Sequence, residues 1–186
     1  REAIEWDFPV SVWETVMGGR YGHMRNDPLW RRLLPARWYD PRHGEAVHRA
    51  LEAVDMLALA KRPIGALSGG QKKRVLLARP LAQQANILLL DEPLAGVDPP
   101  SERLILDVLA REREAGRTVI MVTHDMPGAR RHVDHVVLIN RFIRGVGAPD
   151  EMLSDAKLAE LAVSSTEQSV YDMAADKASS FTVAQG

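Results

Sequence analysis

The chain has 186 residues, of which 46% are apolar and 26% are charged, and its formal net charge is −1. These values indicate one globular domain with a buried core, and they exclude the basic field of a general nucleic-acid-binding protein. The absence of cysteine excludes disulfides and thiolate metal sites. No apolar run approaches the roughly 20 residues of a membrane helix, so any service to a membrane would run through a partner.

The first third of the chain predicts helices rather than strands. Apolar residues recur at helical spacing over 12–17, directly after Ser11, which predicts a short helix capped by that serine. Residues 26–41 combine three prolines with two tryptophans and are typical of an irregular surface excursion. Residues 45–59 show the helical spacing again and predict a second helix, followed by a connection over 61–67.

From residue 68 onward, helices alternate with short apolar strands. Helices are predicted over 68–84, 99–115, 126–132, 149–153 and 156–162, and strands over 86–90, 118–123, 135–140 and 142–146. The first two strands are almost wholly apolar, which predicts burial on both faces in a mostly parallel sheet of an α/β domain. The polar composition from about Ser164 predicts a frayed tail.

A serine and two glycines precede the predicted helix 68–84, in the run Ser68-Gly69-Gly70-Gln71. Such a run leaves backbone N–H groups bare at the positive end of a helix, where they can bind an anion, and the serine hydroxyl and glutamine amide add donors. A serine-capped helix after a glycine turn explains the same residues. The basic residues that follow, Lys72, Lys73 and Arg74, are expected on the solvated face of the helix.

Two acids, Asp91 and Glu92, end the strand predicted over 86–90 and are followed by Pro93. A parallel strand delivers its carboxyl-terminal residues to the ligand crevice. There, an aspartate can hold Mg²⁺ beside nucleotide phosphates, and a glutamate can orient and deprotonate an attacking water. The alternative is a strand that ends by chance in a polar turn.

Two further motifs follow the acids. Gly96 and Asp98 form a small-residue turn, and Asp98 alone predicts a helix N-cap before Pro99. His124 ends the second apolar strand, where an imidazole can reach a terminal phosphate, although a lone histidine there is more often structural. His132 and His135 are expected to be surface histidines rather than a metal pair.

Together, in this order, these motifs resemble the ATP-binding subunit of an ABC transporter. The resemblance rests on the run from Leu67 to Gln71, the aliphatic strand ending in Asp-Glu-Pro, the Gly-x-Asp turn and the Thr-His pair. It implies that Ser68, Gly69, Gly70 and Gln71 are the signature motif, which contacts the γ-phosphate of ATP held by the opposite subunit.

The resemblance also implies a role for each of the remaining motif residues. Asp91 corresponds to the Walker B aspartate near Mg²⁺, and Glu92 corresponds to the general base. Asp98 corresponds to the acid of the D-loop, which crosses the dimer interface, and His124 corresponds to the switch histidine.

The implied fold is α/β: an incomplete P-loop NTPase of ABC type, a nucleotide-binding domain with a mostly parallel sheet and a helical subdomain. The expected division is a helical subdomain over 1–67 that docks a membrane subunit, an ATPase core over 68–163 and a tail over 164–186. Residues 6–12 and 17–22 resemble importers of manganese, zinc or iron.

The implied partners are ATP with Mg²⁺, a membrane permease subunit and a second ATPase subunit, with no nucleic acid. The implied location is peripheral, on the cytoplasmic side of the plasma membrane. Two other classes stay open: a non-transport ABC ATPase of translation or DNA repair, and a non-catalytic regulatory partner of an intact ABC subunit.

The sequence departs from the family in one main respect, because no Gly-x-x-x-x-Gly-Lys-Ser/Thr occurs in the 186 residues. The Q-loop glutamine and the strand with the adenine-stacking aromatic are also missing. The start Arg1-Glu2-Ala3-Ile4 has no initiator methionine, so we expect a chain that begins within a domain and is inactive alone.

Two expectations about stability follow from this reading. Pro80 deletes the hydrogen bond to the Leu76 carbonyl within the predicted helix 68–84, which costs ~3 kcal/mol or kinks the helix. Without the family's first strands, the strand at 86–90 would have an open edge, which predicts poor solubility.

Overall fold

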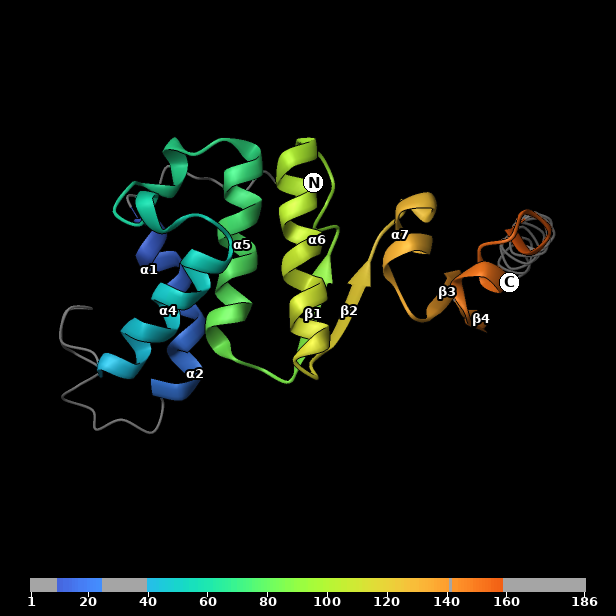
Figure 1. Cartoon of the computed structure of the whole chain (residues 1–186), viewed down its shortest axis with the longest axis horizontal. Helices are drawn as coiled ribbons and strands as arrows, with labels where there is room; N and C mark the ends of the chain where they lie inside the picture. The colour runs from blue at the N-terminus through green and yellow to red at the C-terminus, as the bar shows by residue number, and fades with distance from the viewer. Residues whose placement is uncertain (1–9, 25–39, 141, 159–186) are drawn as a thin grey trace, which may run out of the picture. The chain divides into compact units, whose positions relative to one another are not determined.

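The computed structural model describes residues 10–24, 40–140 and 142–158 of the chain (Figure 1). The chain divides into two compact units, the first ending at Thr123 and the second beginning at His124. Most of the predicted excursion at 26–41 and the whole predicted tail from Ser164 lie outside the described residues. The predicted division at residue 67 stays a prediction.

The first helix described in the first unit is α1 (Val12–Met17), which is capped as predicted. The Ser11 hydroxyl oxygen accepts the Glu14 N–H at 3.2 Å, and the Glu14 carboxylate accepts the Ser11 N–H at 2.9 Å. This reciprocal capping box fixes the start of a helix of only six residues. The chain continues through a 3-10 turn, η1 (Gly18–Arg20), into α2 (Tyr21–Met24).

Helix α4 (Pro41–Ala53) differs from the prediction of one helix over 45–59 at both ends. It begins earlier, because Asp40 caps the first turn and Pro41 occupies the first helical position. It ends at Ala53, because Asp55 adopts a left-handed backbone with φ 52°. Residues Leu57–Leu59 then form the separate 3-10 turn η3.

Helix α5 (Gly69–Gln83) confirms the helix predicted over 68–84. It follows a 3-10 turn, η4 (Ile64–Ala66), and begins after its cap, Ser68. The helix runs through Pro80 and ends at Gln84, whose φ of 57° is left-handed.

The buried Arg20 holds the carboxyl end of α5 against the α1 segment. Its guanidinium donates to the Ala82 carbonyl oxygen at 2.8 Å and the Gln84 side-chain oxygen at 3.0 Å. It also donates to Nδ1 of the buried His43 at 3.2 Å. Burial is the main cause that lowers the pKa of Arg20, and the nearby arginine charges of α4 add to it. A cation at this end of a helix also complements the helix dipole.

Backbone lies directly against backbone where η1 crosses α5. A Cβ at Gly19 would overlap the Arg79 carbonyl oxygen and lie 3.1 Å from the Arg79 carbonyl carbon. Only glycine therefore fits at this crossing.

Strands β1 (Ile87–Asp91) and β2 (Thr118–Val122) pair in parallel, joined by helix α6 (Pro99–Glu114). One face of β1 is buried, since Leu88 is 1% exposed and packs in the same cluster as Ile105 of α6. On the other face Leu89 is 71% exposed. The prediction that both strands are buried on both faces is therefore wrong for the described structure; the exposed apolar residues are Ile87, Leu89, Ile120 and Val122.

A single apolar cluster joins α1, α4, α5, α6 and the buried face of β1. Its members recur at helical spacing, so each helix turns one apolar stripe toward the others. The largest side chains with almost no exposed area are Leu51, Met56, Leu88 and Ile105. This cluster is the hydrophobic core of the first unit.

The second unit contains helix α7 (Met126–His132), an antiparallel hairpin of β3 (Val136–Asn140) and β4 (Phe142–Gly147), and helix α8 (Pro149–Met152). These elements follow the prediction closely, and the helix predicted over 156–162 extends beyond the described residues. The two described sheets, one parallel and one antiparallel, place the molecule in the α/β class. None of the described helices has the length and apolarity to cross a bilayer.

Candidate functional site

The start of α5 is a capped helix end, and its first N–H groups have no partner within the helix. The Ser68 hydroxyl oxygen accepts the Gln71 N–H at 3.3 Å, and the Gln71 side-chain oxygen accepts the Ser68 N–H at 3.0 Å. The N–H groups of Gly69 and Gly70 precede the first intrahelical bond, so the helix itself gives them no partner. Ser68 and Gly69 are exposed. This geometry is suited to an anion at the positive end of a 15-residue helix.

Gly70 is the point where α5 touches the start of α6. A Cβ at Gly70 would overlap Oδ1 of Asp98 and lie 2.9 Å from the Ser101 hydroxyl oxygen. Only glycine therefore allows this approach. The contact links the predicted signature to the predicted D-loop acid within one chain.

Asp98 is the N-cap of α6, as predicted. Its Oδ2 accepts the Ser101 N–H at 3.1 Å. Hydrogen bonds from the Ser101 hydroxyl and then from its N–H hold the pKa of the Asp98 carboxyl below its ordinary value. The carboxylate is therefore charged at neutral pH, and it stays tied to its own helix.

The two predicted acids lie at the carboxyl end of β1, where they face different surroundings. Asp91 is exposed and lines a pocket of about 490 Å³. Glu92 is half-buried, and its N–H donates to the Val122 carbonyl oxygen at 2.9 Å, which ties it to the end of β2. The carboxyl ends of the two parallel strands therefore meet here, as the sequence predicts.

Glu92 has a left-handed backbone, with φ 46°. This conformation costs a side-chain-bearing residue about 1–2 kcal/mol. The ammonium of Lys73 donates to the Glu92 carbonyl oxygen at 2.9 Å in a part-buried contact. A hydrogen bond from a charged donor contributes about 1.5–3 kcal/mol, which is enough to offset the cost.

Lys73 and Arg74 do not lie on a solvated face, so that prediction was wrong for both. The Arg74 side chain is only 15% exposed, and its guanidinium donates to the Val54 carbonyl oxygen at 3.3 Å. Helical spacing could have revealed Lys73, because it lies three residues after the buried Gly70 and four before the buried Leu77.

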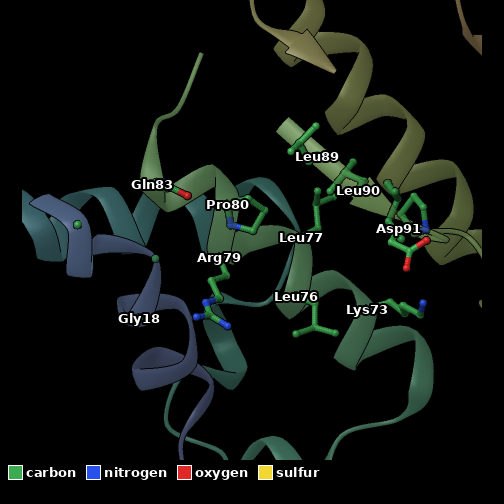
Figure 2. A pocket seen from close by; sticks show the side chains of 14 residues that line it. Gly18, Lys73, Leu76, Leu77, Arg79, Pro80, Gln83, Leu89, Leu90 and Asp91 are labelled. Carbon is green, nitrogen blue, oxygen red and sulfur yellow. The ribbon is translucent and has the colours of Figure 1, made fainter. Parts of the chain in front are cut away.

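The pocket lies beside α5, between the glycines at the end of α1 and the exposed face of β1. Figure 2 shows Lys73 and Asp91 at one end, and Arg79 and Gly18 at the other. Two basic side chains and one carboxylate therefore face a partly apolar hollow; its remaining lining residues include Leu76, Leu77, Pro80, Gln83, Leu89 and Leu90.

Asp91 offers one exposed carboxylate, which fits a Mg²⁺ ion that is also bound by substrate phosphates and water. Mg²⁺ commonly binds one or two carboxylates together with substrate phosphates and water. Within the described residues, no group of three or more His, Cys, Asp or Glu side chains could hold a metal ion. The residues therefore suit a metal that arrives with a phosphorylated substrate.

His124 is exposed and opens the second unit, two residues after β2 ends. Its carbonyl oxygen accepts the Met126 N–H at 3.2 Å, and the next residue, Asp125, caps α7. The predicted role of His124 beside Glu92 stays a prediction. His132 and His135 are exposed, as predicted.

Residues 9–95 match the family model described as ABC transporter. The chain is 40% identical over 157 residues to the manganese transport system ATP-binding protein MntA of Synechocystis sp. (strain ATCC 27184 / PCC 6803 / Kazusa), covering 84% of this chain and 57% of MntA. It is 43% identical over 146 residues to the chelated iron transport system membrane protein YfeB of Yersinia pestis, covering 78% of this chain and 46% of YfeB.

A solved structure of MJ1267, an ATP-binding cassette of an ABC transporter in its ADP conformation, superposes with a TM-score of 0.67. The two are 26% identical, and the match covers 83% of this chain and 63% of MJ1267. The chain thus spans about half to two thirds of the proteins that it matches. Residues 9–95 thus match the ABC transporter model, the fold is that of an ATP-binding cassette, and the sequence is similar to the ATP-binding proteins of manganese and other metal transport systems.

Proposed function

We propose that the chain acts in the ATP-binding subunit of an ABC transporter that imports a metal ion: manganese, zinc or iron. The observation that carries the proposal is the carboxyl end of β1, where Asp91 opens into a pocket and Glu92 is fixed to β2. The names of the relatives support the metal, since they include manganese and chelated iron transport systems. The same names favour transport over the alternative of a translation or DNA-repair ATPase.

Each site residue has a proposed role in ATP hydrolysis. Asp91 holds Mg²⁺, which neutralises phosphate charge when it is bound with ATP. Glu92 orients the attacking water and takes its proton. Asp98 caps its own helix within the D-loop, which crosses the interface with a second ATPase subunit, and His124 contacts the terminal phosphate.

The signature residues Ser68 to Gln71 bind the ATP of the second subunit. The N–H groups at the start of α5 and the Ser68 hydroxyl supply the donors for the γ-phosphate. The two hydrogen bonds between Ser68 and Gln71 fix the donors before the nucleotide arrives, so little conformational entropy is lost on binding.

The proposed assembly contains this chain, a second ATPase subunit and a membrane permease, without nucleic acid. The helical part, over 1–67, docks the permease at the cytoplasmic side of the plasma membrane, and the part over 68–163 carries the catalytic residues. The stretch over 164–186 is proposed to be a tail outside this core.

We further propose that these 186 residues do not hydrolyse ATP alone, because they contain no Gly-x-x-x-x-Gly-Lys-Ser/Thr to cradle the phosphates. In a mixed pair, the chain lends its signature to ATP held by an intact subunit.

Phosphate release with Mg²⁺-ATP tests the proposal, with the chain alone, an intact ATP-binding subunit alone, and the two together. We expect no release by the chain alone and a rate for the mixture above that of the intact subunit. Ser68→Ala should remove this increment, whereas Glu114→Gln, an exposed change at the far end of α6, should keep it. An increment that survives Ser68→Ala contradicts the signature role, and hydrolysis by the chain alone contradicts the proposed inactivity.

The metal is tested separately, by uptake. Deletion of the gene in its source organism should lower the uptake of radiolabelled manganese, zinc or iron. Unchanged uptake of all three ions contradicts the metal part of the proposal.

A further inference from the structure

Lys73 connects the helix that carries the signature to the residue proposed as the general base. It lies one turn after the Ser68 cap, and its side chain crosses to the end of β1 rather than to solvent. The acceptor is the backbone carbonyl oxygen of Glu92, at 2.9 Å. The contact therefore acts on the peptide of Glu92 and not on its carboxylate.

The backbone of Glu92 is held from three directions. Its N–H donates to the Val122 carbonyl oxygen at 2.9 Å, and its carbonyl oxygen accepts the Ala95 N–H at 3.3 Å. The bond from Lys73 to that carbonyl oxygen is shorter, at 2.9 Å. Lys73 therefore adds a charged donor to a carbonyl oxygen that also accepts the longer bond from Ala95.

A left-handed backbone at a residue other than glycine persists only where its surroundings impose it. Glutamate has no intrinsic preference for this region, unlike glycine or asparagine. The direction in which the Glu92 side chain leaves the backbone depends on this conformation. A group that stabilises the conformation therefore aims the side chain.

We propose that Lys73 is a positioning residue, whose ammonium fixes the Glu92 peptide in its left-handed conformation and so sets the direction of the Glu92 carboxylate. The catalytic use of the Glu92 carboxylate rests on the proposed function. The positioning itself rests only on the described contact and backbone angle.

The contact also gives the signature helix a direct route to the acid pair. Gly70 and Lys73 lie on neighbouring turns of α5, and they touch the start of α6 and the end of β1, respectively. The start of α5 is therefore linked by one side chain to the Glu92 peptide.

Amide hydrogen exchange and backbone NMR shifts of the 186-residue chain test the proposal. Lys73→Met keeps the length of the side chain and removes the donor. We expect exchange at the Ala95 amide to become about tenfold faster, because a bond to a charged donor is lost. The carbon shifts of residue 92 should lose their left-handed signature.

Two variants serve as controls. Lys73→Arg keeps a charged donor and should restore slow exchange, whereas a purely packing role would be served as well by methionine. Lys61→Met makes the same change at an exposed lysine and should leave the Ala95 amide unaffected. Exchange at Leu51, in the core, should stay slow in Lys73→Met and report that the variant is folded.

The same Lys73→Met change in a Glu92→Gly variant tests the backbone conformation directly. Glycine adopts the left-handed region without strain, so Lys73→Met should accelerate exchange at Ala95 less in Glu92→Gly than in the native chain. Equal acceleration in both backgrounds, or a Met variant that behaves as Lys, overturns the proposal. None of these measurements involves ATP, so a failed signature assay and a failed positioning test remain distinguishable.

Discussion

The helices of the first unit and its strand pair differ in how completely they are covered. The helices α1, α4 and α5 bury their apolar stripes against one another, and residues such as Val47 and Leu51 have no exposed area. Strand β1 buries Leu88 on one face and exposes Leu89 to 71% on the other, and β2 is only partly buried on its better covered face. The proposed catalytic acids lie on the less covered of the two, at the carboxyl end of β1.

Stability and the candidate site therefore depend on different parts of the unit. Because buried apolar area is the main source of stability, the helices supply most of it. The helices also hold the backbone beside the acids in place, through contacts such as that of Lys73 with the Glu92 carbonyl oxygen. Substitutions in the two parts should therefore have unequal effects.

The largest contrast is expected between two leucines. Leu51→Ala should lower the free energy of unfolding by about 2–5 kcal/mol, because it leaves a cavity in the core of the helices. Leu89→Ala, the same change on the exposed face of β1, should alter it by less than about 0.5 kcal/mol. Urea unfolding measures both, and equal losses would show that the exposed face is covered in solution.

The next largest effect is expected at Pro80, inside α5. Pro80→Ala restores a helical N–H and should raise stability by up to about 3 kcal/mol. The thermal midpoint should rise, by about 2–4 °C for each kcal/mol gained in a chain of this size. An unchanged midpoint would mean that α5 already accommodates the proline without cost.

A smaller loss is expected where the signature helix meets α6. Gly70→Ala places a methyl group against Asp98 and Ser101 and should destabilise the chain by about 1–3 kcal/mol. Gly69→Ala is the matched control, because nothing lies within 4 Å of its Cβ position. Chemical unfolding of both variants gives the difference, and equal stabilities would show that the contact with α6 is loose.

The smallest effect is a change in pH dependence at Asp98. Its pKa is lowered in the folded chain, so its contribution is present above the ordinary carboxyl pKa of about 3.9 and is lost as the pH falls further. Asp98→Asn keeps a good cap without a charge, so its stability should fall less than that of the native chain between pH 7 and pH 3. Asp107→Asn, in the middle of α6, should retain the native slope, and a native slope in Asp98→Asn would exclude a role for this carboxylate.

Local signals in the sequence predicted most of the fold. Ser11, Ser68 and Asp98 each precede an apolar helical pattern, and each is a cap in the structure. The start of α4 carried a comparable signal, Asp40 before Pro41, but the prolines of 26–41 masked it. The end of α4 carried none, because the left-handed turn occurs at an aspartate rather than a glycine.

The site was harder to predict, because its contacts join distant parts of the chain. The sequence placed Asp91 and Glu92 at a strand end, but an apolar run cannot reveal which face of a strand is covered. The sequence likewise could not reveal that Lys73 bonds to a carbonyl oxygen 19 residues away. Such contacts follow from packing. The helical spacing of Gly70, Lys73 and Leu77 was a local signal that the Lys73 side chain faces the interior.

The crossing at Gly19 has a mechanical consequence. Side chains that separate two helices can change rotamer and absorb a small shift, but the peptides of Gly19 and Arg79 meet with no side chain between them. A push on the segment after α1 therefore passes to α5 as a rigid displacement. Because of this glycine, the junction between η1 and α5 is a stiff contact of backbone with backbone.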